Sequence, residues 1–454
     1  MRVVFVQPPN LQRSGDWKKM RVSRPPINIA LLAAYIGQFG CESFIYDFDW
    51  FEGTVEDMAK LILSKNPDVV GFTCLTPRMR ITLFIAAKIK ELNPNVKIII
   101  GGAHVNAAKE RSLYSKDIDY AIYGESEQAL IELLRAIETN GDLKYIQNLI
   151  YRDDNKVIMN PARSFIQNLD ELPFPAWELL NLQEYRDHST FDGIHMGVMT
   201  SRGCPWDCIF CSSGVVWGHK VRFRSVESVI KELEQIVHNL GITNIMFYDD
   251  TFTVNKPRFL KICNEATKRK LNLKYYCQLR VDTIDEEVAD ALAESGCIAA
   301  ALGVESGDEE ILKVLKKGIE KGQIYKAVKA LKSAEVPILA SYIIGSPGET
   351  HESIQRTFEF AKELDTDQTK FMICTPFPGT ELFGMAVEKG LLTDDLSPDQ
   401  CAEVTYYQHV TANLSKVSNE DLLHYQRLAY NMFEQKPLVP SKKWQQERTV
   451  DNDY

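Results

Sequence analysis

The sequence of 454 residues lacks any long hydrophobic run: no stretch approaches the roughly 20 apolar residues that a membrane-spanning helix needs. It also lacks a secretory signal, because the run Met1-Arg-Val-Val-Phe-Val-Gln-Pro-Pro9 is short and stops at two prolines, which is typical of a first strand. We therefore expect a cytoplasmic protein with no membrane partner. A hydrophobic content of 45% is ordinary for a globular chain, and the length predicts two or three domains.

Basic blocks and a disulfide framework are missing as well. Lys and Arg number 52 against 62 Asp and Glu, so the net charge is −10. That balance argues against nucleic acid as an electrostatically bound partner. The ten cysteines are scattered, apart from one group, and in a chain of this size such scatter predicts a reducing cytosol.

The exception is a loop that carries three cysteines, Ser201-Arg-Gly-Cys-Pro-Trp-Asp-Cys-Ile-Phe-Cys-Ser-Ser213. Cys204, Cys208 and Cys211 have the spacing C-x3-C-x2-C. Three thiolates on one short loop can bind three irons of a 4Fe–4S cluster and leave the fourth iron open to a small molecule. Structural zinc would need a fourth ligand, and the nearest candidate, His219, stands in a stretch without a second one. The spacing therefore favours an iron–sulfur cluster.

The first 150 residues alternate between short β-rich runs and amphipathic stretches. One helix is expected over 54–63, with Thr54 as its N-cap and Asp57 as the acidic residue at its third position. This alternation predicts a doubly wound, Rossmann-like (flavodoxin-like) parallel sheet, whose ligands bind beyond the carboxyl ends of the strands. The expected strands are 3–6, 43–47, 69–73, 97–100 and 120–123.

A second alternating series follows, and it predicts a partial (β/α)6 barrel with its chemistry at the carboxyl ends of the strands. Its expected strands are 195–200, 244–248, 274–279, 298–304, 338–344 and 368–373. The stretch 225–240 has apolar residues at helical spacing, Ser225 as N-cap and Gly241 as its stop. The cysteine loop directly follows the first of these strands.

Four segments are thus expected. Residues 1–145 form the Rossmann-like domain, and 146–190 form a connector held against its neighbours by Phe174 and Trp177. Residues 191–384 form the partial barrel, and 385–454 form a small, mainly helical C-terminal segment with a loose tail from 436. Aromatic residues of this last segment either cap the barrel mouth or pack against the barrel: Tyr406, Tyr407, Tyr425, Tyr430 and Phe433.

Several runs of the first domain resemble the cobalamin-binding domain that precedes many radical S-adenosylmethionine (SAM) enzymes. They are Pro25-Pro-Ile-Asn-Ile-Ala-Leu-Leu-Ala-Ala-Tyr-Ile36, Asp68-Val-Val-Gly-Phe-Thr73, Gly101-Gly-Ala-His104 and Tyr123-Gly-Glu-Ser-Glu127. Together with the cysteine triplet, the resemblance covers about the first 385 residues. It implies three cofactors: a 4Fe–4S cluster on the three cysteines, SAM and cobalamin.

By this resemblance, cobalamin contacts would come from the strand-end loops: Thr73, Leu75, Thr76, Arg78, Gly101, Gly102, His104, Gly124 and Glu125. Many cobalamin proteins ligate cobalt with the His of a D-x-H-x-x-G motif, but this chain has Asp49 near that position. A carboxylate is a poor substitute for imidazole, so we expect no protein His on cobalt. The lower face of the cofactor would then meet Leu75, Thr76 and Arg78. His104 either contacts the cofactor or is an ordinary loop histidine.

The strand ends of the barrel would hold SAM in the same family. Phe210 would offer its backbone to the adenine, an acidic residue of the Asp249-Asp250 pair would meet the methionine ammonium, and Arg280 would bind the methionine carboxylate. Glu305 would bind the ribose hydroxyls and Gly345 would lie on the adenine side. A solvated loop is the alternative for the acidic residues, and a structural ion pair for Arg280.

The expected activity is methylation of an unactivated carbon in a small molecule or natural-product intermediate, by way of a 5′-deoxyadenosyl radical and methylcobalamin. No catalytic side chain is predicted, because such cofactors carry the difficult chemistry. An external one-electron reductant, such as flavodoxin or ferredoxin, would be the partner. Oxidative cyclisation or rearrangement, as in the anaerobic tetrapyrrole cyclases, is the alternative within the family. A cobalamin-binding regulator without catalysis is the alternative from another class.

Overall fold

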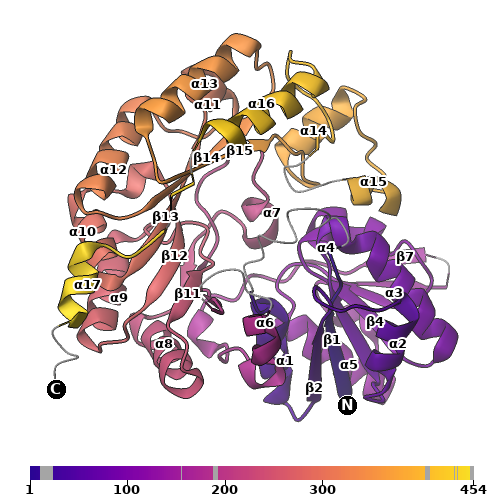
Figure 1. Ribbon diagram of the computed structural model, residues 1–454. Coiled ribbons are helices and arrows are strands. Elements are labelled where there is room, and N and C mark those ends of the chain that lie inside the picture. The colour runs from indigo at the N-terminus through magenta and orange to yellow at the C-terminus, as the bar shows by residue number, and fades with distance from the viewer. Residues whose placement is uncertain are drawn as a thin grey trace.

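The computed structural model describes residues 1–10, 24–154, 156–187, 193–403, 409–433, 435–436 and 438–449. Two α/β units lie side by side in Figure 1, the N-terminal one in indigo and purple and the second in pink and orange. The C-terminal helices, in yellow, lie against the second unit and reach toward the first.

The first unit is built on a seven-stranded sheet of order β2-β1-β3-β4-β5-β6-β7. Its first five strands are parallel, and β6 and β7 are antiparallel additions at one edge. The order 2-1-3-4-5 is that of flavodoxin-like folds, so the predicted fold class is confirmed. The strands are β1 (Arg2–Gln7), β2 (Glu42–Asp47), β3 (Val69–Thr73), β4 (Lys97–Gly101), β5 (Tyr120–Ile122), β6 (Leu149–Asp153) and β7 (Lys156–Met159).

Helices cover both faces of this sheet because alternate strand residues point to opposite sides. On one face Val3 and Phe5 pack with apolar residues of α1 and α5, and on the other Val4 and Val6 pack with those of α2 and α3. The capping box expected at Thr54 and Asp57 is present at the start of α2. The helices are α1 (Ile27–Gly37), α2 (Val55–Leu63), α3 (Met79–Leu92), α4 (Ala103–Ala108) and α5 (Glu127–Thr139).

The second unit has six parallel strands in the order β15-β14-β13-β12-β11-β8, so β8 and β15 are the two edges. This arrangement confirms the expected partial barrel. The strands are β8 (Met196–Val198), β11 (Asn244–Phe247), β12 (Lys274–Leu279), β13 (Cys297–Glu305), β14 (Ile338–Ile344) and β15 (Gln368–Ile373). A separate two-stranded antiparallel ribbon, β9 (Ser201–Arg202) with β10 (Arg222–Phe223), frames the cysteine loop.

The barrel strands are separated by helices along its outer side (Figure 1). In α8 (Val226–Leu240) the side chain of Ser225 caps the first turn and Gly241 ends the helix in the left-handed conformation, as the sequence predicted. The remaining helices of this part are α6 (Leu182–Asp187), α7 (Ser213–Trp217), α9 (Lys256–Lys268), α10 (Glu286–Ser295), α11 (Glu309–Val314), α12 (Lys321–Ser333) and α13 (His351–Leu364). Short 3₁₀ turns occur at Thr76–Arg78, Lys109–Ser112, Leu143–Tyr145, Leu169–Glu171, Trp177–Leu179 and Val281–Thr283.

The stretch 146–190, expected to be a connector, contains β6 and β7, which extend the first sheet. These two strands pair antiparallel through short turns, with no helix between them, so the pattern of alternating strands and helices did not predict them. Farther along, Trp177 is buried and the Ala176 N–H donates to the Ala30 carbonyl at 3.0 Å. Phe174 lies under the guanidinium of Arg224. This later part is packed against both units.

The C-terminal segment contains α14 (Glu381–Glu388), α15 (Pro398–Glu403), α16 (Asn419–Met432) and α17 (Lys442–Thr449). Helix α16 covers the edge strand β15, where the Gln426 side chain donates to the Phe371 carbonyl at 3.0 Å. Tyr425 and Phe433 pack around Phe358, which favours packing over a cap at the barrel mouth. Tyr406 and Tyr407 lie outside the described residues.

The expected loose tail needs a correction, because α17 lies within it. Ser441 caps this helix through the Trp444 N–H and donates to the Ala293 carbonyl at 3.1 Å, so the helix is tied to α10. The sequence is polar here and carries no apolar stripe that would predict a helix. The helix is stabilised by its docking on a neighbouring helix. Residues 450–454 lie outside the described part of the chain.

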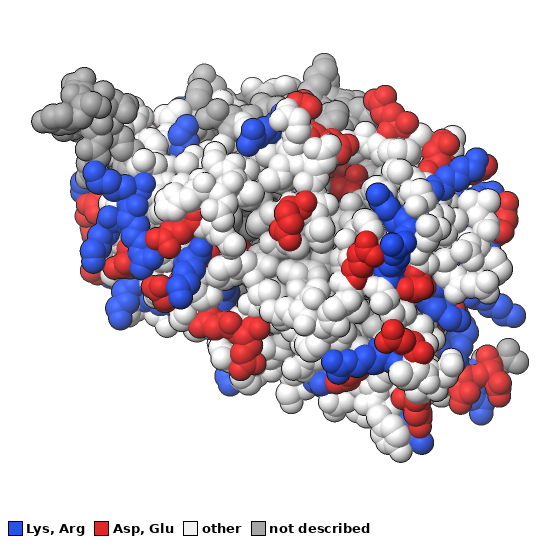
Figure 2. Space-filling model, turned by 90° about the horizontal axis from the view of Figure 1, so that it is seen from below, with Lys and Arg blue, Asp and Glu red and all other residues white. Residues whose placement is uncertain are grey.

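The surface carries both signs of charge close together. Figure 2 shows blue and red side chains interspersed on the described part of the lower face, around a largely uncharged centre. In the described residues, no helix is both long and apolar enough to cross a bilayer.

Candidate active site

The cysteine loop begins from a fixed anchor at the end of the first barrel strand. Asp249 is buried, and its carboxylate accepts hydrogen bonds from the Thr200 N–H at 3.0 Å, from the Thr200 hydroxyl at 2.6 Å and from the Ser201 hydroxyl. Gly203 has φ of +106°, and an added Cβ would lie 2.5 Å from the Lys220 carbonyl. Asp249 therefore positions the loop and does not line the chamber described next.

All three cysteines of the loop line one chamber of about 400 Å³ inside the partial barrel. They are free thiols, and burial raises the pKa of both Cys204 and Cys208. Each thiolate of a 4Fe–4S cluster binds a different iron, so the three sulfurs need not converge on one point. Among the described residues, no three Cys, His, Asp or Glu side chains form a single-ion site.

Arg280, expected to bind the methionine carboxylate, is already occupied in this structure. Its Nε and Nη2 donate to the two carboxylate oxygens of Asp282, each at 3.1 Å, and Nη2 also donates to the Lys317 carbonyl at 2.8 Å. Its Nη1 lies 3.8 Å from the Cys208 sulfur, and its guanidinium stacks on Trp206 at 4.1 Å. These contacts disfavour a carboxylate of SAM as its partner and make Arg280 a support of the cysteine loop.

Asp250 and Glu305 line the same chamber as the cysteines, as does Phe210. Asp250 accepts a hydrogen bond from the Ser213 hydroxyl at 2.6 Å, and burial raises its pKa. Glu305 has φ of +66° and pairs with Lys317 at 2.7 Å. A non-glycine residue held at positive φ marks a position that its surroundings constrain.

Gly345 lies apart from this chamber. It has φ of +88°, an added Cβ would lie 3.1 Å from Leu422 of α16, and its N–H donates to Glu349 at 2.6 Å. The structure thus brings Phe210, Asp250 and Glu305 together with the cysteines and Arg280, and leaves Asp249 and Gly345 in supporting positions.

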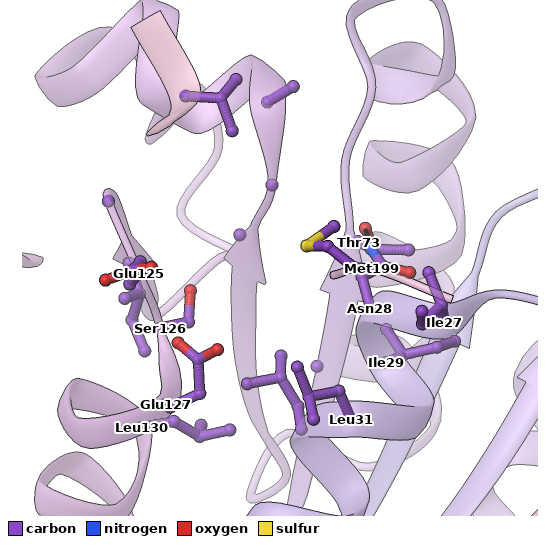
Figure 3. Close-up of a pocket in the computed structure, with 18 of the residues that line it drawn as sticks. Ile27, Asn28, Ile29, Leu31, Thr73, Glu125, Ser126, Glu127, Leu130 and Met199 are labelled. Carbon is purple, nitrogen blue, oxygen red and sulfur yellow. Dashed lines mark hydrogen bonds between the residues drawn. The ribbon is translucent and has the colours of Figure 1, made fainter. Parts of the chain in front are cut away.

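A second, largely apolar cavity of about 300 Å³ opens at the strand ends of the first unit. Figure 3 shows Ile27, Asn28, Ile29 and Leu31 of α1 facing Glu127 and Leu130 of α5 across it, and Met199 of the barrel unit and Thr73 line it as well. Six of the predicted cobalamin residues line it: Thr73, Leu75, Gly101, Gly102, Gly124 and Glu125. Val216 and Trp217 of α7, directly after the cysteine loop, line it too.

Three other predicted cobalamin residues are buried beside the cavity without lining it. Arg78 donates to Asp49 at 3.0 Å and to the Pro8 carbonyl. His104 is fully buried between the hydroxyls of Thr76, at 3.2 Å, and Tyr114, at 3.1 Å. Burial lowers the His104 pKa to about 4, so its ring is neutral at physiological pH. Of the two interpretations of His104, the structure favours the ordinary loop histidine.

Glu125 binds two arginines of the second unit, which the sequence did not predict. One carboxylate oxygen accepts hydrogen bonds from Arg202 and Arg222, each at 2.7 Å, and the other accepts from the Ile166 N–H at 2.6 Å. Arg202 also donates to Glu127 at 2.7 Å. All four side chains are at most 5% exposed. This network, which we call the interdomain latch, joins a strand-end loop of the first unit to β9 and β10.

Sequence signals for the latch were weak. Arg202 stands inside the cysteine loop run, and Glu125 and Glu127 stand inside the Tyr123–Glu127 run, but no local pattern pairs positions so far apart. The architecture now defines a class: a two-domain α/β protein in which a three-cysteine barrel loop faces the ligand edge of a flavodoxin-like domain.

Comparisons with known proteins agree with that class. A model of the radical SAM superfamily matches residues 198–361, and a model of the B12 binding domain matches residues 19–134. An uncharacterised methyltransferase of Pyrococcus horikoshii is 38% identical over 86% of this chain and 84% of its own length. The anaerobic magnesium-protoporphyrin IX monomethyl ester cyclase of Rubrivivax gelatinosus is 28% identical over 84% of this chain and 69% of its own length.

Among solved structures, the radical SAM methyltransferase TsrM from Kitasatospora setae, with cobalamin and a [4Fe-4S] cluster bound, superposes with a TM-score of 0.73. It shares 19% identity over 86% of this chain and 75% of that one, and this likeness shows the fold. The chain belongs to the family of cobalamin-dependent radical SAM enzymes that includes methyltransferases and magnesium-protoporphyrin cyclases. The resemblance drawn from the sequence is thereby confirmed.

Proposed function

We propose that this protein binds a 4Fe–4S cluster, SAM and cobalamin, and methylates an unactivated carbon of a small molecule. One observation carries the proposal: the cysteine loop and the helix α7 that follows it contribute residues to both cavities. Cys204, Cys208 and Cys211 line the barrel chamber, and Val216 and Trp217, on the helix that follows, line the apolar cavity of the first unit. Cofactors held in the two cavities would therefore meet across one loop.

The cysteine loop fits a cluster with one open iron. Its three thiols are free and share a chamber, and Arg280 supports Cys208 from the side. A cationic guanidinium beside a thiolate stabilises its negative charge. Asp249 holds Thr200 and Ser201 at the start of the loop.

The apolar cavity fits the bulky body of cobalamin. Gly102 has φ of +100°, and an added Cβ there would lie 2.9 Å from the Cys74 carbonyl, so only glycine brings this turn to the cavity edge without strain. Leu75 is 36% exposed and lines the cavity, whereas Arg78 and Thr76 do not. We therefore propose Leu75 as the residue nearest the lower face of the cofactor. Among the described residues that line the cavity there is no histidine.

SAM would be held in the barrel chamber by Asp250, Glu305 and the backbone at Phe210. When bound, the three cofactors supply radical generation and a transferable methyl group. The chain's own residues bind and orient them, and the apolar walls exclude water from the space between the cavities. Deprotonated Asp250 is suited to an ammonium group, and Glu305, fixed by Lys317, is suited to hydroxyl groups.

The partners and compartment belong to the same proposal. Reducing the cluster requires an external one-electron donor such as flavodoxin or ferredoxin. The ten cysteines are all free thiols, and a reducing cytoplasm would keep those of the loop ready for iron. Oxidative cyclisation remains the second candidate, because a relative that covers 84% of this chain is a cyclase.

Replacing Cys208 with Ala tests the proposal against a non-catalytic regulator. Anaerobic reconstitution of the wild type with iron, sulfide and cobalamin should give the visible absorption of both cofactors, and reduction with SAM should yield 5′-deoxyadenosine. Cys208→Ala should retain cobalamin and form no 5′-deoxyadenosine.

Cys41→Ser, a half-buried thiol far from the loop in sequence, is the matched control and should behave as the wild type. Retention of 5′-deoxyadenosine formation in Cys208→Ala would contradict the cluster assignment. Failure of the wild type to retain cobalamin would contradict the assignment of the apolar cavity.

A further inference from the structure

The barrel chamber holds more positive charge than its acidic residues neutralise. Four basic side chains line it, and two of them are paired: Arg280 with Asp282 and Lys317 with Glu305. The other two, Arg24 and Lys370, have no carboxylate partner among the described residues. The remaining acidic group of the chamber, Asp250, is bonded to Ser213.

Lys370 points into the chamber from the middle of the edge strand β15. It is in register with Ser341 of β14, which lines the chamber as well, and lies three residues before the end of its strand at Ile373. Burial lowers the pKa of Lys370, and the positive charge of Arg24 lowers it further. Arg24 and Lys370 line the same chamber and carry the same charge.

Arg24 comes from the other unit of the molecule. It stands just before α1, whose residue Ile27 lies next to Gly197 of β8, the opposite edge of the barrel. Its guanidinium is hydrogen-bonded to Tyr248, while its Nε is buried without a hydrogen-bond partner among the described residues. Arg24 and Lys370 thus face the chamber from its two open edges.

Two like charges in a partly desolvated chamber are costly unless an anion joins them. A guanidinium and an ammonium together match the two or three oxygens of a carboxylate or phosphate. Polar side chains that can complete such a shell also line the chamber: Tyr276, Ser341 and Gln368.

We propose that Arg24 and Lys370 form an anion subsite that binds a carboxylate or phosphate group of the substrate. This inference rests on the proposed function, because it places the substrate in the chamber beside the cysteines. The carboxylate of SAM has the same chemistry, but SAM must reach the open iron at the carboxyl strand ends, and Lys370 lies deeper along its strand. The substrate is therefore an acid or a phosphorylated molecule, held by its charged end.

The test uses the reconstituted, oxidised holoenzyme with saturating SAM, so that the open iron is occupied. Binding of methylphosphonate is followed by ³¹P NMR, and the affinity for SAM is measured separately by equilibrium dialysis. We expect saturable methylphosphonate binding in the wild type, and binding weaker by about tenfold or more in Lys370→Met and in Arg24→Met, as for loss of a charge-assisted hydrogen bond. The affinity for SAM should change less than about twofold.

Lys370→Arg, which keeps the charge, should retain most of the binding. Lys326→Met, at an exposed position of α12, is the control for simple loss of one positive charge. Unchanged binding in both Met variants overturns the subsite, as does a wild type that fails to saturate below roughly 100 mM. Parallel loss of SAM affinity would assign the two cations to SAM. Failure of the proposed function appears separately, as a wild type without cofactor spectra or 5′-deoxyadenosine.

Discussion

At the scale of single residues, the structure shows which charged groups near the strand ends have a carboxylate partner. Arg78 pairs with Asp49 and Arg280 pairs with Asp282, although both arginines stand at strand ends where ligands bind. Burial makes an unpaired charge costly, so a buried arginine close to a carboxylate pairs with it. Arg24 and Lys370 are informative because they line the chamber with no carboxylate partner among the described residues.

Glu349 gives a prediction at this scale. Its carboxyl accepts the N–H groups of Gly345 and Ser346, but burial raises its pKa to about 8. The unfolded chain loses this proton near pH 4.5, whereas the folded chain keeps it to about pH 8. The contribution of Glu349 to stability is therefore fully present below the unfolded pKa of 4.5 and is lost as the pH rises through the folded pKa of about 8.

The urea midpoint of the wild type should therefore fall between pH 5.5 and 7.5 more steeply than that of Glu349→Gln, which cannot titrate. Between these two pH values, the wild type should lose on the order of 1–3 kcal/mol more free energy of unfolding than Glu349→Gln. Glu388→Gln, at an exposed position of α14, should keep the slope of the wild type. Equal slopes in the wild type and Glu349→Gln would show that this carboxyl titrates normally.

At the scale of elements, local patterns predicted most helices and strands. The strands β3, β12, β14 and β15 have the bounds that the sequence predicted, because each is a short β-rich run between turn residues. The failures, β6, β7 and α17, lie where pairing with a neighbour decides the structure. An antiparallel edge strand and a polar docked helix carry little signal of their own.

The N-cap of α8 gives the prediction at this scale. Ser225 accepts a hydrogen bond from the Ser228 N–H at 3.1 Å, and α8 covers one flank of the barrel. Ser225→Ala should lower the free energy of unfolding by about 1 kcal/mol, because one N–H of the first turn loses its acceptor.

Ser225→Asn keeps an acceptor at the same place and should lie within about 0.5 kcal/mol of the wild type in urea unfolding. Equal midpoints for Ser225→Ala and Ser225→Asn would mean that the cap contributes nothing measurable to this helix.

At the scale of the whole molecule, the interdomain latch sets how the two cavities face each other. Arg202 bonds to Glu125 and Glu127, which lie 77 and 75 positions earlier in the chain. Arg202 also stacks on Trp217, which lines the apolar cavity of the first unit. The latch thereby connects the start of the cysteine loop, the wall of the apolar cavity and the first unit.

Removing this arginine should loosen the two units. Arg202→Met leaves Glu127 buried without its partner, so the loss of stability should be about 3–5 kcal/mol, seen as a lower urea midpoint. Arg2→Met breaks an exposed pair with Glu42 and should cost less than about 1 kcal/mol. If Arg202→Met unfolds at the same urea concentration as Arg2→Met, the latch does not hold the units together.

The sequence by itself determined the features that depend on near neighbours, which are the cysteine spacing, the alternation of strands and helices, and the caps at Thr54 and Ser225. The cysteine triplet, together with the runs of the first domain, also identified the family. Only the tertiary structure decided which strand-end residues line a cavity and which groups they contact. Glu125 faces two arginines, His104 faces two hydroxyls, and Arg24 and Lys370 face one chamber from distant parts of the chain. Local conformation depends on residues within a few positions, whereas the partner of a buried charge depends on which distant segments the fold brings together.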